Sequence, residues 1–287
     1  MNTEITNKPI LFISDLDGTL LGSDSRLSQA SIGLLNEAIR SGALFSIATA
    51  RTPATVSSLL SEVRTNLPFV VMTGSTLWNP ANQEYSHTRF LPESQARQVL
   101  DIYRILGFSS FIYTLRNGML HIYHTGPLSE QERRFMAERA DSPFKTFHVP
   151  PSGESVLPPD LDNVMLFYGI RETEISRRVY QEVKNTVDCS PLCYHDIYGP
   201  DIAVAEVFAA DATKAQGIKT LAEMTGAVET IVFGDNINDL PMFRQADISV
   251  AVENAVPEVR QAADIVIGPN TSDAVPHFIL DRILHRY

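Results

Sequence analysis

The chain has 287 residues, of which 44% are hydrophobic and 20% are charged. That length corresponds to one large domain or two, and the composition is typical of a globular rather than a disordered protein. The 34 Asp and Glu residues exceed the 23 Lys and Arg residues, so the net charge is −11. Such an acidic protein has no general attraction for nucleic acid or anionic lipid surfaces. It can bind an anion only through a local cationic cluster or a metal ion.

Nothing in the sequence indicates secretion or membrane insertion. No stretch approaches the ~20 apolar residues of a transmembrane helix, and the segment Met1–Pro9 has charges in place of an apolar core. The two cysteines, Cys189 and Cys193, are too few for a disulfide framework and lack nearby residues to complete a zinc site. We therefore expect a soluble, cytoplasmic protein with free thiols and no obligate protein partner.

Both ends of the chain alternate short apolar segments with amphipathic helices. The predicted strands are residues 10–14, 43–48, 69–72, 230–233, 248–252 and 264–267. The predicted helices are residues 28–41, 53–64, 213–224, 240–245, 256–263 and 272–285. Mostly apolar strands between helices are typical of a parallel sheet that is covered on both faces. The fold class expected is therefore α/β, with a Rossmann-like, mostly parallel sheet.

The middle of the chain has a different pattern, because its strands alternate and are joined by hairpin residues. Asn117-Gly118, the strongest kind of short-range hairpin signal, lies between segments 111–115 and 119–123. Downstream we predict a loop at 143–159, a strand at 163–170 and a helix at 173–185.

This change of pattern divides the chain into two domains. We predict a core domain of residues 1–84 and 198–287 and an inserted α+β domain of residues 85–197. The hinges are expected at Trp78–Gln83 and Tyr198–Asp201, which are rich in turn residues.

Two aspartates, Asp15 and Asp17, follow the first predicted strand. Strand periodicity would point both carboxylates the same way, at the edge of the sheet where open α/β folds bind ligands. Such carboxylates repel each other, and a bound Mg²⁺ would relieve the repulsion. The alternative is a plain turn with a helix cap at Asp17-Gly18-Thr19.

Three other segments bring polar groups to the same edge. Thr49 has a hydroxyl and neighbouring N–H groups that suit an oxyanion, although a capping threonine would look the same. Lys214, in the first turn of its helix, opposes the helix dipole; it either contacts a phosphate or is a solvated surface residue. The segment Gly234-Asp235-Asn236-Ile237-Asn238-Asp239 adds oxygen ligands, although Gly-Asp is also common in turns.

The order and types of these four segments resemble those of the haloacid dehalogenase superfamily of phosphohydrolases. The large insertion and the Gly-Asp-Asn-x-Asn-Asp ending resemble its Cof-like branch of sugar-phosphate phosphatases. The resemblance covers about residues 9–84 and 198–287; the insert matches in position, size and α+β character. The sequence departs from the usual pattern of this family at two places that bear on substrate fit. Ala50 stands where many relatives have a glycine, and Thr73-Gly74-Ser75 stands in place of the usual Asn-Gly-Ala.

The resemblance implies a role for each motif residue. Asp15 is the expected nucleophile, and Asp17 the expected general acid and base. Thr49, Lys214 and Asn238 are expected to hold the phosphoryl oxygens, and Asp239 to orient the site. Mg²⁺ is the implied cofactor, held by Asp15, Asp235 and the backbone carbonyl of Asp17.

The resemblance also makes the insert a cap that contacts the leaving group of a small phosphorylated substrate. The candidate substrate contacts are Arg116, Asn117, His121, His124, Tyr194 and His195, each of which could instead be an ordinary polar surface or turn residue.

The motifs and the resemblance favour the interpretation that the protein is a Mg²⁺-dependent phosphatase of small phosphorylated metabolites. Sugar phosphates are the expected substrate class. Three alternatives remain: a phosphosugar mutase or phosphotransferase, a glycosyl-phosphoglycerate or sucrose-phosphate phosphatase, and a phospho-ligand binding module without turnover. The binding module would not need Asp17 beside Asp15.

Overall fold

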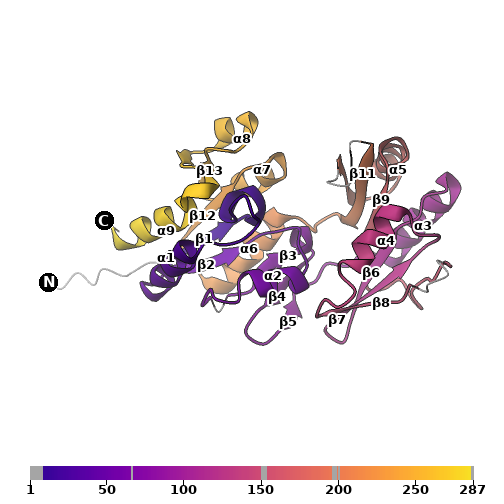
Figure 1. The fold of residues 1–287 in the computed structure, drawn as a ribbon, viewed down its shortest axis with the longest axis horizontal. Helices are drawn as coiled ribbons and strands as arrows, with labels where there is room; N and C mark the ends of the chain where they lie inside the picture. The colour runs from indigo at the N-terminus through magenta and orange to yellow at the C-terminus, as the bar shows by residue number, and fades with distance from the viewer. Residues whose placement is uncertain (1–8, 66, 150–153, 196–198, 200, 286–287) are drawn as a thin grey trace. The chain divides into compact units, whose positions relative to one another are not determined.

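The structure, a computed structural model, describes residues 9–65, 67–149, 154–195, 199 and 201–285. The chain divides into two compact units. The core unit comprises Met1–His87 and Thr213–Tyr287, and the inserted unit comprises Thr88–Ala212 (Figure 1). No helix among the described residues is long and apolar enough to cross a membrane.

A five-stranded parallel sheet forms the centre of the core unit, in the order β14-β13-β12-β1-β2. Its strands are β1 (Ile10–Ser14), β2 (Leu44–Ile47), β12 (Glu229–Gly234), β13 (Ile248–Val252) and β14 (Ile265–Ile267). β1 and β12 are neighbours in the middle, although more than two hundred residues separate them in sequence. The two ends of the chain therefore build one parallel sheet, which confirms the predicted fold class.

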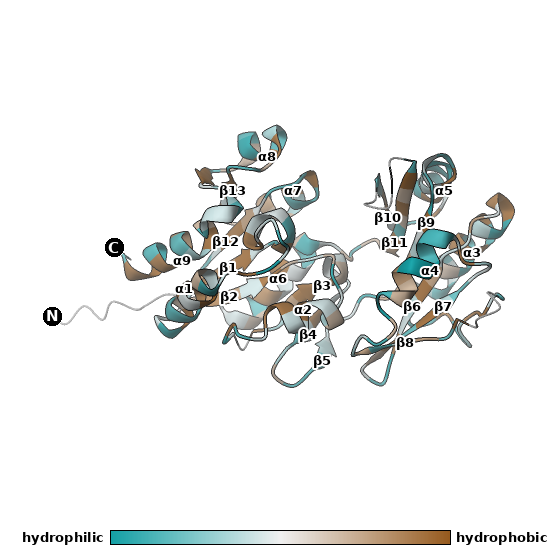
Figure 2. Cartoon of the chain, viewed as in Figure 1, coloured by the Kyte–Doolittle hydropathy of each residue, from teal (hydrophilic) through white to brown (hydrophobic). Residues whose placement is uncertain are grey.

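Helices surround this sheet. They are α1 (Gln29–Arg40), α2 (Pro53–Leu59), α6 (Lys214–Thr225), α7 (Leu240–Phe243), α8 (Pro257–Ala262) and α9 (Ala274–Leu284). α1 packs against α9, and α6 against β1. The hydropathy colouring in Figure 2 shows brown, hydrophobic strands and mixed helices, as expected where only one helix face is buried. α2 ends at Leu59 and not at the predicted Arg64.

A small antiparallel sheet extends the core unit with β3 (Phe69–Val71), β4 (Thr76–Asn79) and β5 (Glu84–Ser86). A parallel bridge from Ala48 to Val70 joins it to the end of β2. The expected hinge at Trp78–Gln83 covers the end of β4 and the turn of the β4–β5 hairpin, because Asn79 pairs with Glu84. That prediction was wrong: its turn residues reverse a hairpin within one unit.

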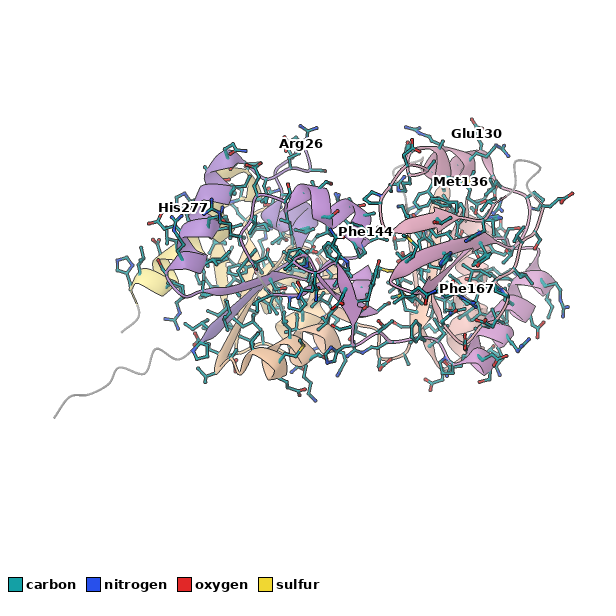
Figure 3. All side chains as sticks on the ribbon, turned by 90° about the horizontal axis from the view of Figure 1, so that it is seen from below. Arg26, Glu130, Met136, Phe144, Phe167 and His277 are labelled. Atoms are coloured by element: carbon teal, nitrogen blue, oxygen red, sulfur yellow. The ribbon has the colours of Figure 1, made fainter. Side chains whose placement is uncertain are left out.

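The inserted unit contains a six-stranded sheet in the order β10-β11-β9-β6-β7-β8. Its strands are β6 (Phe111–Arg116), β7 (Met119–His124), β8 (Lys145–Phe147), β9 (Val164–Glu172), β10 (Cys189–His195) and β11 (Ile202–Ala209), and its helices are α3 (Glu93–Leu106), α4 (Glu130–Ala137) and α5 (Thr173–Thr186). Asn117 and Gly118 form the predicted turn between β6 and β7, with φ of 50° and 72°. Phe167, labelled inside this unit in Figure 3, is completely buried.

Two details of the inserted unit differ from the sequence-based expectation. The predicted loop at 143–159 contains β8, which pairs in parallel with β7. β11 lies in this unit and not in the core, because it pairs along its length with β9 and β10. The second boundary is therefore at Ala212/Thr213, after β11. Of the second expected hinge, Tyr198 and Pro200 lie outside the described residues.

Candidate active site

Asp15 lies directly after β1 and is 7% exposed. Its backbone N–H donates to the carbonyl oxygen of Phe233 on β12 at 2.9 Å, which extends the parallel ladder by one residue. The pKa of Asp15 is raised to about 7. Burial is the largest cause, and Asp239 adds to it, while Lys214 acts in the opposite direction. The strand thus holds a carboxylate in the interior at the carboxyl end of the sheet.

Lys214 connects two carboxylates of the site. Its Nζ donates to Oδ1 of Asp15 and to Oδ1 of Asp239, both at 2.8 Å. Burial disfavours the ammonium, but the two carboxylates outweigh it and raise the pKa of Lys214 above its ordinary value. Lys214 is 4% exposed, so it is not the solvated surface lysine that the sequence left as an alternative.

Asp239 positions the chain that follows β12. Its Oδ2 accepts hydrogen bonds from the backbone N–H groups of Asp235 and Asn236 at 3.0 and 3.1 Å. Completely buried, it fixes the turn from which the Asp235 side chain projects.

Asp235 faces the loop that follows β1. Its Oδ1 accepts a hydrogen bond from Oγ1 of Thr19 at 2.8 Å. At Gly18, φ is +78°, and an added Cβ would lie 2.4 Å from Oδ2 of Asp235. Only glycine therefore lets the two segments approach this closely. Burial, as the largest cause, raises the pKa of Asp235 to about 6.

Asp17 differs from Asp15 in its surroundings, since its side chain is 52% exposed. The strand ends at Ser14, so the period of two that would align both carboxylates does not continue to Asp17. Both oxygens of Asp17 accept hydrogen bonds from Arg51, at 2.8 Å from Nε and 2.5 Å from Nη2. Arg51 was not singled out from the sequence; its place two residues after Thr49 was the available signal.

Thr49 lies beyond the end of β2 and is 1% exposed. Its Oγ1 accepts a hydrogen bond from the Arg51 N–H at 3.2 Å, and its carbonyl accepts one from the Thr73 N–H at 3.0 Å. The hydroxyls of Thr73 and Ser75 are buried and have no hydrogen-bond partner in the described part of the chain. Asn238 is exposed on the turn before Asp239.

The site contains a set of oxygen donors that fits a divalent cation. Asp15, Asp235 and Asp239 each offer an oxygen atom, and these atoms all lie within 4.8 Å of one another. Lys214 supplies one positive charge to this cluster. The pKa values of Asp15 and Asp235 are nevertheless raised, because the effect of burial exceeds the opposing effect of Lys214. Carboxylate oxygens are the ligands that Mg²⁺ prefers.

The candidate substrate contacts lie on two parts of the inserted unit, the β6–β7 hairpin and β10. Arg116 pairs with Asp160, and Asn117 occupies the hairpin turn. His121 Nδ1 lies 2.8 Å from His148 Nε2, and His195 Nε2 lies 3.2 Å from Nη2 of Arg177. Tyr194 is 45% exposed.

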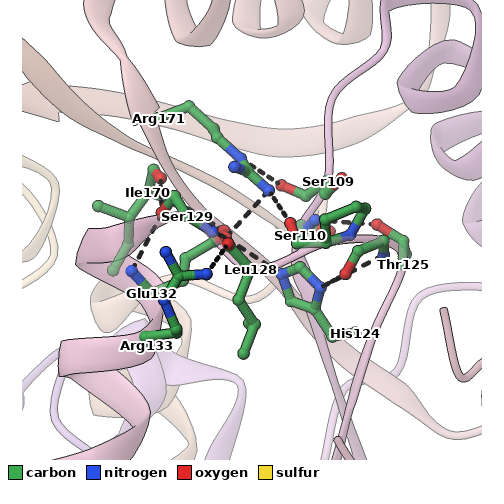
Figure 4. A network of polar contacts seen from close by, with 12 residues as sticks. Ser109, Ser110, His124, Thr125, Leu128, Ser129, Glu132, Arg133, Ile170 and Arg171 are labelled. Atoms are coloured by element: carbon green, nitrogen blue, oxygen red, sulfur yellow. Dashed lines mark hydrogen bonds and ion pairs between the residues drawn. The ribbon is translucent and has the colours of Figure 1, made fainter. Parts of the chain in front are cut away.

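His124 is completely buried, so it cannot reach a ligand outside the unit. Its Nδ1 lies 2.5 Å from the carbonyl oxygen of Gly126, and its Nε2 lies 3.4 Å from the buried Glu132 (Figure 4). Glu132 also pairs with Arg171 at 2.9 Å and closes the capping box of α4 with Ser129. The expectation that His124 contacts substrate is not supported: it is part of a network that anchors α4.

Comparisons with known proteins agree with this architecture. The family model for haloacid dehalogenase-like hydrolases matches residues 12–279. The chain is 23% identical over 282 residues to the Bacillus subtilis 5-amino-6-(5-phospho-D-ribitylamino)uracil phosphatase YitU, covering 95% of this chain and 97% of that one. It is 22% identical over 281 residues to the Escherichia coli pyridoxal phosphate phosphatase YbhA, covering 94% and 97%.

Solved structures show the same fold. A haloacid dehalogenase-like hydrolase from Bacteroides thetaiotaomicron superposes with a TM-score of 0.73 at 22% identity, covering 95% of this chain and 98% of that one. The subclass IIB sugar phosphatase BT4131 superposes with a TM-score of 0.70, also at 22% identity, covering 95% and 99%. The chain belongs to the haloacid dehalogenase-like hydrolase family, as its sequence motifs predicted.

Proposed function

We propose that this protein is a Mg²⁺-dependent phosphatase that hydrolyses small phosphorylated metabolites through a phosphorylated Asp15. The observation that carries the proposal is the Lys214 ammonium between Asp15 and Asp239, with Asp235 beside them. This arrangement combines a nucleophilic carboxylate with positive charge and with oxygen ligands for a cation. Phosphoryl transfer requires this combination, because charge on three phosphoryl oxygens must be offset.

The residues assigned to magnesium are Asp15, Asp235 and the backbone carbonyl of Asp17. Bound there, Mg²⁺ would offset the charge of the carboxylates and of the phosphoryl oxygens. Asp239 would act indirectly, by fixing the Asp235 backbone and by sharing Lys214 with Asp15.

In the first chemical step, an oxygen of Asp15 attacks phosphorus, and the bond from phosphorus to the leaving oxygen breaks. Asp17 gives that oxygen its proton. In the second step, Asp17 takes a proton from water as the water attacks phosphorus, which releases inorganic phosphate and restores the Asp15 carboxylate. Thr49, Lys214 and Asn238 hold the phosphoryl oxygens throughout.

We assign sugar phosphates and related phosphorylated metabolites as the substrate class. The relatives are named for a phosphorylated ribitylamino uracil and for pyridoxal phosphate, and a structural neighbour is named a sugar phosphatase. We further propose that the inserted unit supplies the contacts that distinguish one leaving group from another.

The test is inorganic phosphate release across a panel of phosphorylated sugars, polyols and vitamin precursors. Hydrolysis is expected with Mg²⁺, and EDTA should abolish it until Mg²⁺ is added back. Full activity in EDTA would contradict the magnesium assignment. Transfer of the phosphoryl group to a second sugar without phosphate release would identify a mutase instead.

A further inference from the structure

Lys145 is a buried cation that has no carboxylate partner among the described residues. It lies on β8, opposite Leu120 of β7, and is 7% exposed. None of the ion pairs among the described residues includes it, whereas the buried Lys214 has two carboxylates and the buried Glu132 has Arg171. A buried charge without an opposite charge destabilises a fold, so its presence requires an explanation.

The surroundings of Lys145 are aromatic and positively charged. Its Nζ lies 5.9 Å from the centre of the Phe147 ring, and the guanidinium carbon of Arg139 lies 4.1 Å from the centre of the Phe135 ring. Phe111 contacts both rings, with centroid distances of 5.5 Å to Phe135 and 6.1 Å to Phe147. The two cations therefore lie over one aromatic cluster.

Neither ring contact provides a negative charge, and Lys145 itself has no carboxylate partner among the described residues. Arg139 pairs with Glu138 at 2.9 Å, and its own positive charge opposes that of Lys145. An ammonium near the ~6 Å limit of a cation–π contact gains little from the ring. Burial and Arg139 together lower the pKa of Lys145 to about 8. A methionine would fill this position without the electrostatic cost, so packing alone does not account for the lysine.

We propose that Lys145 and Arg139 form a site for the oxyanion of a small metabolite, a carboxylate or a phosphate group, in the inserted unit. The ammonium supplies a charge-assisted hydrogen bond, and the neighbouring guanidinium adds positive charge. The partly exposed ring of Phe147 provides an apolar surface for the carbon skeleton, whereas Phe135 is buried against Tyr168 and Arg139. This inference concerns binding only, so it does not require that the protein hydrolyse phosphate esters.

The first experiment measures thermal unfolding in inorganic phosphate and in chloride at equal ionic strength. It uses the Asp15→Asn protein alone and combined with Lys145→Met or Lys184→Met. Lys184 is a matched control, because its Nζ lies 5.4 Å from the centre of the Tyr180 ring but the residue is exposed. Phosphate should raise the midpoint in the parent and the Lys184 variant by more than in the Lys145 variant. An equal shift in all three proteins, zero included, would overturn the proposal.

The second experiment identifies the source of the oxyanion. Calorimetry on the same three inactive proteins compares 6-phosphogluconate with glucose 6-phosphate, which lacks the carboxylate. If the oxyanion belongs to the phosphorylated ligand, the acid should bind about tenfold more tightly, and Lys145→Met should remove that preference while Lys184→Met retains it. Equal affinities, together with phosphate stabilisation that depends on Lys145, would assign the site to a separate anion. Because Asp15→Asn is used throughout, a failure of catalysis cannot be mistaken for a failure of this site.

Discussion

Arg51 holds Asp17 by both carboxylate oxygens, through Nε at 2.8 Å and Nη2 at 2.5 Å. The pair connects the loops after β1 and β2, and it fixes an aspartate whose side chain is otherwise half exposed. Two-point contact gives orientation as well as charge, and a lysine in place of the arginine cannot reproduce it.

This contact makes Arg51 a positioning residue for the proposed acid and base. We expect Arg51→Lys to lower kcat by about 10- to 100-fold and to change KM by much less, because a misplaced Asp17 slows proton transfer. Steady-state kinetics on the best substrate would measure both constants. Arg26→Lys, in an exposed loop of the same unit, is the control. A selective rise in KM would show instead that Arg51 binds substrate.

Lys214 is expected to be necessary for stability as well as for turnover. Lys214→Met leaves Asp15 and Asp239 buried without their shared cation, so unfolding should become easier by about 3 kcal/mol at neutral pH. Urea denaturation in EDTA measures this cost. Lys219→Met, exposed on the same helix, should change stability by less than about 0.5 kcal/mol. Equal stability of the two variants would contradict the paired arrangement.

Gly18 permits the close approach of Asp235. Gly18→Ala would bring a Cβ to 2.4 Å from the Asp235 carboxylate and would strain a backbone with positive φ. Activity and Mg²⁺ affinity should both fall at least about tenfold. The control is Gly33→Ala in α1, where an added Cβ meets nothing within 4 Å and should stabilise the helix by about 0.5–1 kcal/mol. Unchanged Mg²⁺ affinity in Gly18→Ala would exclude this geometry.

Lys145 is expected to make stability depend on pH in the alkaline range. Its pKa is about 8 in the folded protein, below its ordinary value, so the folded state binds this proton less tightly than the unfolded state. The charged lysine therefore lowers the free energy of unfolding by its full amount below pH 8. This loss of stability decreases as the pH rises towards the ordinary pKa of lysine.

Lys145→Met should therefore stabilise the protein on the order of 2 kcal/mol at pH 7 and by much less near pH 10. Urea unfolding at both pH values, referenced to Lys184→Met, measures the difference. A stabilisation that is the same at both pH values would mean that the lysine is not desolvated.

The sequence alone predicted most of the core unit, because its strands are continuous apolar segments that only a covered parallel sheet accommodates. It also predicted the hairpin at Asn117-Gly118, where local backbone preference decides the turn. It missed β11, since the polar Glu206 within an apolar segment gave no indication of which sheet the strand would join. The sequence also did not predict β8, which lies in a proline-rich segment and forms a strand only because it pairs with β7 in the folded protein.

The motif residues could be located from the sequence, but their environments could not. Whether Lys214 was buried or solvated depended on two aspartates from distant segments. The bond between Arg51 and Asp17, and the burial of His124 against Glu132, likewise arise only after the elements pack. Lys145 is the clearest case, since an isolated lysine in a predicted loop gives no sign of burial.

The most direct test of the central claim, that Asp15 is the nucleophile, is phosphate release by Asp15→Asn with Mg²⁺. The control is Asp24→Asn, which changes an exposed aspartate in the same loop region. Asp15→Asn should remain folded by circular dichroism and lose at least about a thousandfold in kcat, while Asp24→Asn should retain normal activity. An Asp15→Asn protein that hydrolyses substrate at a rate near that of the unmodified chain would contradict the account.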